Sequence, residues 1–412
     1  MTDVVTLPAP VNAPAPAPAP PASPRARVLH IRMDVREFFL THATAAIFPF
    51  TAGLILYGWR ALALSALVVG STFAGLLVWR RVGWRGSVIR MSYGLWSAGL
   101  LALTLPAHLA AVSSQQPGGG GGPPWAVLAG GGLALSALLW LVGPAGASRL
   151  HPVLLAHLLL VILFGDLLVP SRVLQRNHLV VGDLLDSPLT PAPLPGKEPW
   201  AVATLSTRHS GVSVVPASGQ LREFTTGQAE PGEAGFITLD EVIRDRLPPL
   251  EDLIVGAQPG PVGAASAVAV IMGGLFLLYR GLIDYRIPLL IVLAAFAALL
   301  VLPIPVVITD GAPQWRWIAF RQPSIGWSWA ITFANYELMA GPLLFVACFL
   351  ATAPGVRPMT RRARTIYAVC VGVVAAMLQL YLSISFGPYL ALLAVGLMAP
   401  LLDRWFKPRP LV

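Results

Sequence analysis

Three ionisable residues, His157, Asp166 and Glu337, lie inside long apolar runs of the sequence. Such groups are costly to place in hydrocarbon, and they usually face a cavity or a partner. Asp166 and Glu337 fall near one end of their runs, where water could reach them, whereas His157 lies deeper. Two interpretations stay open for each residue: a position on an ion path, or a structural hydrogen bond to a neighbouring helix.

The sequence carries no motif for nucleotide or zinc chemistry: G-x-x-x-x-G-K, H-E-x-x-H and a G-x-G-x-x-G after a strand are all missing. Cys348 and Cys370 lie inside apolar runs without C-x-x-C spacing, so neither a disulfide framework nor an iron–sulfur site is predicted. We therefore predict no metal site and no catalytic acid or base.

The elements that must position these residues are membrane helices. The chain has 412 residues, of which 56% are hydrophobic and 11% charged, against about 25% charged residues in soluble domains. Its apolar runs approach the roughly 20 residues that cross a bilayer. The net charge of +9 comes largely from arginines at the ends of these runs, where they orient helices. We therefore predict a polytopic protein whose partner is the lipid bilayer and not nucleic acid.

The predicted fold is all-α, with about ten transmembrane helices in two five-helix inverted repeats and an extracytoplasmic insertion between them. The predicted spans are 43–59, 61–79, 91–112, 125–142, 151–169, 263–279, 287–308, 327–352, 366–384 and 388–402. The predicted regions are a disordered Pro/Ala-rich tail (1–24), a first membrane half (25–170), the insertion (171–262), a second membrane half (263–405) and a cytoplasmic tail (406–412).

Orientation and symmetry follow from charge and proline placement. With both termini in the cytoplasm, the short outer connections hold only Arg60, Arg316 and Arg321. Because five spans is an odd number, the second half enters the bilayer from the opposite side, as in an inverted repeat. The third span of each half ends at a proline, in LLALTLPAH (100–108) and CFLATAPGV (348–356). These prolines either terminate the helices or open a paired, broken-helix feature.

Several segments, read in order, resemble the RnfD/NqrB family, which comprises the RnfD membrane component of the Rnf electron-transport complex and the NqrB component of the sodium-translocating NADH:quinone reductase. They cover nearly every predicted helix between residues 29 and 405. The segments that carry the resemblance are LHIR (29–32), YGWRALALSALVV (57–69), LLALTLPAHL (100–109), GPAGASRLHPVLLA (143–156), the stretch 251–289 from EDLIVG to YRIPL, ACFLATAPGV (347–356) and GPYLALLAVGLMAPLLDRW (387–405).

The resemblance implies a multi-pass bacterial inner-membrane subunit that takes part in electron transfer coupled to Na⁺ or H⁺ movement. In that family, a threonine in an outward-facing S-G-A-T-P-L motif carries FMN through a phosphoester bond made by a flavin transferase. A second flavin, riboflavin, is held noncovalently among the helices, and the partners are other membrane, flavin and iron–sulfur subunits. Such a component is not catalytic alone, because the reactive groups belong to cofactors.

The motif's place after the fifth span is taken by SPLTPAPL (187–194). The resemblance assigns Thr190 as the FMN attachment residue and Ser187 as the motif's serine. Pro188 and Leu189 replace the family's Gly and Ala, and proline fixes φ and removes an N–H where glycine lets a transferase approach. Other family positions change too: F-N-P-A becomes LHPV (150–153), and A-T-D-P becomes ATAP (351–354).

Three functions therefore stay open. The first is a divergent electron-transport subunit with FMN on Thr190, and the second is a flavin-less paralogue that keeps the scaffold. The third is an independent inverted-repeat transporter or channel for a small solute or ion. The insertion adds a predicted short strand or hairpin in TLSTRHSGVSVV (204–215) and a short amphipathic helix in TLDEVIRDRL (238–247), either a partner-docking subdomain or an ordered linker.

Overall fold

The structure is a computed structural model that describes residues 35–82, 91–110, 124–142, 150–168, 217–229, 235–247, 250–256, 260–317, 326–382 and 386–406. The predicted tail 1–24, residues 407–412 of the predicted tail 406–412, the predicted strand or hairpin in 204–215, and the site residues Ser187 and Thr190 lie outside these residues.

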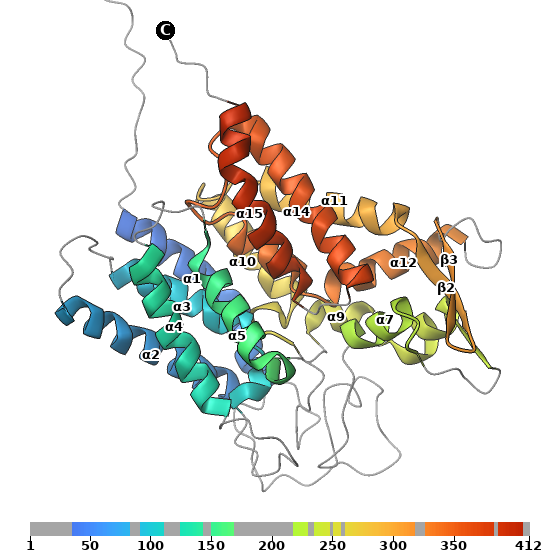
Figure 1. Ribbon diagram of the computed structural model, residues 1–412, viewed down its shortest axis with the longest axis horizontal. Helices are drawn as coiled ribbons and strands as arrows, with labels where there is room; N and C mark the ends of the chain where they lie inside the picture. The colour runs from blue at the N-terminus through green and yellow to red at the C-terminus, as the bar shows by residue number, and fades with distance from the viewer. Residues whose placement is uncertain are drawn as a thin grey trace, which may run out of the picture. The chain divides into compact units, whose positions relative to one another are not determined.

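Each predicted span overlaps a helical segment (Figure 1). The helical segments at the first five predicted spans are α1 (Val35–Tyr57), α2 (Trp59–Val82), α3 (Met91–Thr104) with the 3₁₀ turn η1 (Ala107–Ala110), α4 (Pro124–Val142) and α5 (Pro152–Leu168). The second five are α10 (Ala267–Tyr279), α11 (Arg286–Val301), α12 (Gly326–Met339) with α13 (Leu343–Phe345) and the π-helical turn η5 (Val346–Leu350), α14 (Arg361–Tyr381) and α15 (Gly387–Trp405).

Several of these helices are long and apolar enough to cross a membrane. Among the described residues, four qualify by length and composition: Glu37–Tyr57, Trp59–Val82, Trp125–Val142 and Arg361–Tyr381. A fifth span results if Ser328–Met339 and Leu343–Leu350, which bend by 65° at their break, count together. The protein is therefore a mostly helical, multi-pass membrane protein.

Close helix pairs recur in both halves of the chain. In the first half α2 packs along α4, and in the second α11 packs along α14, while α1 of the first half packs on α10 of the second (Figure 1). Glycine lies at each of these contacts, because a Cβ atom at Gly132, Gly372 or Gly273 would collide with the backbone of the partner helix. Small residues that let helix backbones approach are the usual basis of packing inside a membrane.

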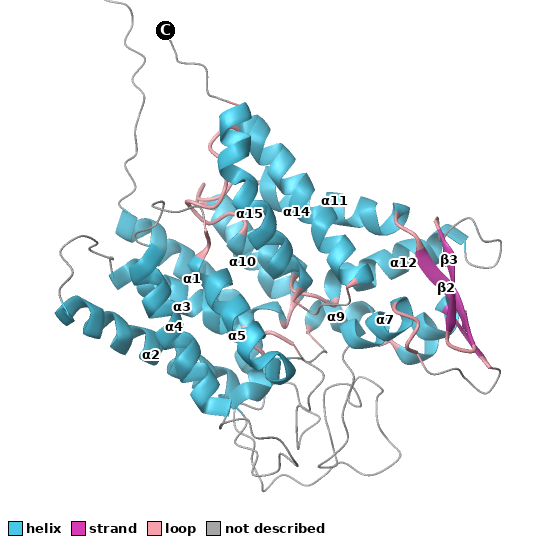
Figure 2. Cartoon of the chain, in the orientation of Figure 1, coloured by secondary structure: helices cyan, strands magenta, loops and turns pink. Residues whose placement is uncertain are grey.

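A small sheet departs from the all-α prediction (Figure 2). Strands β1 (Phe236–Thr238), β2 (Ile304–Thr309) and β3 (Ala312–Arg316) pair antiparallel in the order β1-β2-β3. The predicted span 287–308 is thus wrong at its end: α11 stops at Val301, and Leu302 is extended (ψ 144°), the conformation favoured before a proline, here Pro303. Asp310 and Gly311 then form the two-residue turn, both with positive φ, that suits a hairpin.

The insertion between the halves supplies β1 and several short helical elements. They are α7 (Ala217–Thr225), α8 (Leu239–Glu241), the π-helical turn η2 (Val242–Arg246), α9 (Leu250–Val255) and the 3₁₀ turn η3 (Val262–Ala264). The helix predicted in 238–247 is confirmed, and Thr238 caps it by accepting a hydrogen bond from the Glu241 N–H at 3.2 Å. Since β1 pairs with β2, the insertion and the connection after α11 build one small subdomain.

Candidate functional site

Helix α3 ends at Thr104, two residues before Pro106, and backbone N–H groups bond to the carbonyls that this break frees. A proline cannot donate to the carbonyl four residues earlier, which here belongs to Ala102. The Leu105 N–H donates to that carbonyl instead, at 3.3 Å, and the Leu105 carbonyl accepts from the Val262 N–H at 3.0 Å. The backbone groups at this break are therefore satisfied by other backbone groups of the chain.

The second half repeats this arrangement at Pro354. The Ala353 N–H donates to the carbonyl of Leu350 at 3.2 Å, which is the carbonyl that proline leaves unused. Thr352 donates its hydroxyl to the Cys348 carbonyl at 2.7 Å. Gly355 then turns the chain with φ 94°, a left-handed conformation that favours glycine.

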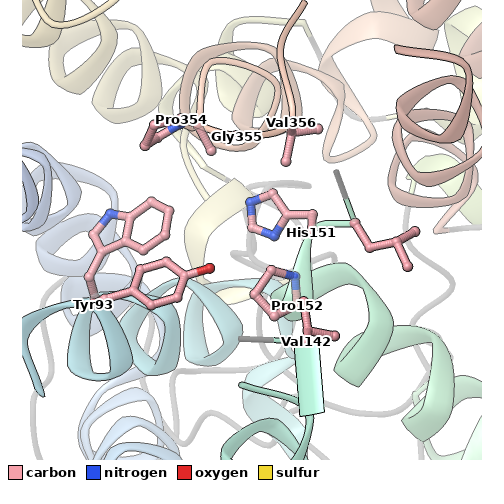
Figure 3. Close-up of a pocket in the computed structure, with 10 residues that line it drawn as sticks. Tyr93, Val142, His151, Pro152, Pro354, Gly355 and Val356 are labelled. Carbon is pink, nitrogen blue, oxygen red and sulfur yellow. The ribbon is translucent and has the colours of Figure 1, made fainter. Parts of the chain in front are cut away.

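Beyond this second break lies a small cavity (Figure 3). It is lined by three groups of residues: Tyr93 and Trp96 of α3 with Val142 of α4, the turn 150–152 before α5, and residues 353–356. Figure 3 shows His151 between the 354–356 turn on one side and Tyr93 and Pro152 on the other. The cavity has room for about one water molecule.

Two buried histidines lie at this cavity and beside it. His151 is 2% exposed, and neither of its ring nitrogens has a hydrogen-bond partner among the described residues. His42 of α1 is fully buried, and its Nδ1 accepts a 2.9 Å hydrogen bond from Trp96 Nε1. That bond leaves the hydrogen of the neutral His42 ring on Nε2, which has no partner in the described part of the chain. Trp96 connects the two, because its ring centroid lies 5.4 Å from that of His42 and 6.3 Å from that of His151.

This cluster can hold one small polar molecule among neutral imidazoles at the contact between the two halves. On the second-half side, Phe349 of η5 packs beside His42, with ring centroids 5.7 Å apart. Within the described residues, no three His, Cys, Asp or Glu side chains lie close enough together to hold a metal ion. The unpartnered ring nitrogens of the cluster are suited to hydrogen bonding with a small polar molecule.

Charged residues fix the loop that carries the second break. The guanidinium of Arg364 forms an ion pair with the carboxylate of Asp284, with Nη1 3.4 Å from Oδ2. Its Nε also donates a 2.9 Å hydrogen bond to the Pro358 carbonyl. Burial lowers the pKa of the Arg357 guanidinium in this loop; the charge of nearby Arg364 lowers it further, and that of Asp284 raises it. These contacts tie the 351–360 loop to the start of α11 and to α14.

The residues singled out in the sequence do not converge. His157 of α5 is 4% exposed, and its ring lies beside that of Tyr389 of α15. Glu337 of α12 is 6% exposed, so it is buried and not wet as its place near a span end suggested. Asp166 belongs to α5, but its side chain is outside the described residues, as are Ser187 and Thr190.

Sequence reasoning missed the roles of His42 and His151. His42 lies just before the predicted first span, and His151 lies where the sequence departs from the family's F-N-P-A motif. An imidazole at the edge of an apolar run was the available signal for both. Their connection through Trp96 carries no local sequence pattern, because Trp96 and His42 are 54 residues apart.

Comparison with known proteins identifies the family. The sequence model of the NQR2, RnfD, RnfE family matches residues 25–411. The chain belongs to this family. Members of the NQR2, RnfD, RnfE family with similar sequences include the D subunit of the ion-translocating oxidoreductase complex of Halorhodospira halophila, 24% identical over 403 residues and covering 94% of both chains. The protein of the same description from Stutzerimonas stutzeri is 28% identical over 388 residues and covers 92% of both.

A further relative bears a more specific description. The D subunit of the Na(+)-translocating ferredoxin:NAD(+) oxidoreductase complex of Acetobacterium woodii is 28% identical over 166 residues, which are 40% of this chain and 43% of that protein. The resemblance predicted from the ordered motifs is thus confirmed at the level of the NQR2, RnfD, RnfE family.

Proposed function

We propose that this chain is the RnfD-type membrane component of an Rnf complex that couples electron transfer to the movement of Na⁺ or H⁺ across the bacterial inner membrane. The observation that carries the proposal is the coverage: relatives described as the D subunit of ion-translocating oxidoreductase complexes match 94% and 92% of the chain. The multi-pass helical structure agrees with that role. Its partners are then the other membrane, flavin and iron–sulfur subunits of the same complex.

The proposed topology has ten spans in two inverted repeats, with both termini in the cytoplasm. Three observations support it: the α2–α4 pair corresponds to the α11–α14 pair, α1 packs on α10, and both third spans break two residues after a threonine, at Pro106 and Pro354. The exposed Trp315 and Trp317 follow the apolar end of α11, as expected of an interfacial aromatic belt at the outer surface.

We further propose that Thr190, with Ser187 beside it, is the attachment residue for FMN. The hydroxyl of Thr190 would carry the flavin as a phosphate ester, which supplies one-electron and two-electron redox chemistry to the complex. Both residues lie outside the described part of the chain, so the support is the order of motifs alone. Riboflavin does not fit the cavity beside His151, which has room for about one water molecule.

A flavin-less scaffold subunit is the second candidate, and Pro188 is the observation that favours it. Proline in place of the family's glycine stiffens the backbone next to the hydroxyl that a transferase must reach. The two candidates differ in whether the chain carries a covalent flavin, and share the same place in the complex.

In-gel flavin fluorescence separates them. The full chain is expressed with a flavin transferase, denatured and run on a gel, beside the variants Thr190→Ala and Thr204→Ala. Flavin attachment gives a fluorescent band that Thr190→Ala abolishes and Thr204→Ala, a control threonine in the same insertion, keeps. A wild-type chain without fluorescence removes FMN from the proposal. Copurification of flavin and iron–sulfur subunits with a tagged chain tests complex membership separately, and their absence would refute the subunit role.

A further inference from the structure

A second small cavity lies between α5 and α15, the last helices of the two halves. Its lining is apolar except for two side chains, His157 and Tyr389, and it has room for about one water molecule. The apolar lining residues are Leu154 and Leu158 of α5, Phe386 just before α15, and Leu390 and Leu393 of α15. The cavity therefore lies at a contact between the halves, with one polar side chain on each side.

Both polar side chains are buried without partners. His157 is 4% exposed and Tyr389 3% exposed. Among the described residues, neither the ring nitrogens of His157 nor the hydroxyl of Tyr389 have a hydrogen-bond partner. The ring centroids lie 4.8 Å apart at an interplanar angle of 57°, so the side chains are adjacent but not bonded to each other.

Two buried polar side chains without partners lower the stability of the fold unless a molecule in the cavity forms hydrogen bonds with them. A buried polar group without a partner loses the hydrogen bonds it made to water, at a cost of about 1–3 kcal/mol each. Most buried polar groups in native proteins have a partner, and ordered water supplies it where protein does not. A neutral imidazole offers one donor and one acceptor, and a phenol offers both as well. A water molecule placed between them can bond to each.

We propose that a single water molecule occupies this cavity and joins His157 of the first half to Tyr389 of the second. The site is distinct from the cavity at His151, and it does not depend on the flavin or on the electron-transport role. The two halves then share a polar contact inside the membrane, where apolar packing alone gives little directional preference.

The test compares the thermal stability of purified full-length protein in detergent across four chains: wild type, Tyr389→Phe, His157→Phe and the double variant. A bound water predicts that each single variant lowers Tm by roughly 2–4 °C, because the water loses a ligand and its site. It also predicts that the double variant falls little further, because the same water is lost in every case.

Tyr367→Phe is the matched control. Tyr367 of α14 is fully buried, its hydroxyl also has no partner within the described ranges, and it lines neither of the two small cavities. Removing an unpaired hydroxyl that lines neither cavity leaves Tm unchanged or raises it. The proposal is overturned if Tyr389→Phe leaves Tm unchanged or raises it, as Tyr367→Phe does. It is also overturned if the decrease in Tm of the double variant equals the sum of the decreases in the two single variants.

A second measurement keeps the proposal testable where His157→Phe fails to fold. Tyr389→Phe removes one oxygen atom and keeps the ring, so it can be compared with Tyr367→Phe alone. An experimental density map that resolves ordered water should show a peak within hydrogen-bonding distance of His157 and Tyr389. An empty cavity in such a map contradicts the proposal whatever the stability data.

Discussion

The glycine run 130–132 in α4 gives a sharp test of how closely the helices of the first half approach each other. Gly132 faces α2: a Cβ atom there would lie 2.6 Å from the Val68 carbonyl oxygen and 3.0 Å from the Thr72 nitrogen. Two residues earlier, a Cβ at Gly130 would have no described atom of another element within 4 Å. The two positions share a helix and a residue type and differ in what they face.

We expect Gly132→Ala to destabilise the protein and Gly130→Ala to leave it unchanged or stabilise it. To bring the contact at Gly132 from 2.6 Å to the 3.4 Å of ordinary contact, the Val68 backbone must withdraw by about 0.8 Å. Overpacking of this kind costs about 1–3 kcal/mol. Both substitutions gain up to about 1 kcal/mol from the better helix propensity of alanine. The difference between the two variants should therefore be about 1–3 kcal/mol.

The measurement is the thermal unfolding of both variants and the wild type in the same detergent, with the difference in Tm between the two alanine variants as the readout. Comparing variants in one helix cancels the propensity gain and isolates the contact with α2. Equal stability of Gly132→Ala and Gly130→Ala, or a more stable Gly132→Ala, would refute the close α2–α4 packing.

Three further outcomes follow from other contacts. Gly372→Ala should destabilise the α11–α14 pair as Gly132→Ala does the first, because its Cβ would lie 3.0 Å from the Ala295 nitrogen; unchanged Tm contradicts the shared packing. Thr238→Ala removes a helix cap worth about 0.5–2 kcal/mol and should speed amide exchange in 235–247, with Thr238→Ser restoring protection. Asp284→Asn breaks the half-buried pair with Arg364, and the resulting loss of stability should shrink at high salt.

The helical part of the fold was predictable because length and apolar content determine it. The predicted span 125–142 corresponds closely to α4, and the predicted span 366–384 overlaps α14, which begins earlier at Arg361 and ends earlier at Tyr381. The end of α11 was not predictable from hydropathy, because Ile304–Thr309 is as apolar as the helix before it. The signals that distinguish them are local: Pro303 and Pro305 stop a helix, and Asp310–Gly311 is a hairpin turn.

The site was less predictable than the fold, for a physical reason. That His42 and His151 lie near each other depends on packing among α1, α3 and the start of α5, and no periodic pattern encodes it. His157 was found as a buried imidazole, but its neighbour Tyr389 lies on a helix at the other end of the chain. Partners so distant in sequence are specified by tertiary contacts, which a single sequence does not display.

The two broken helices indicate where the halves differ in what they offer a ligand. At each break the residue before the proline donates to the carbonyl that the proline leaves unused, so neither break needs a ligand to satisfy that carbonyl. The first break is then closed by backbone, since Val262 bonds Leu105. The second ends at a cavity lined by His151, whose ring nitrogens have no partner among the described residues. The two breaks are therefore alike in their backbone hydrogen bonds and unlike in their surroundings, and of these two described breaks the second is the one that offers a place to a small polar molecule.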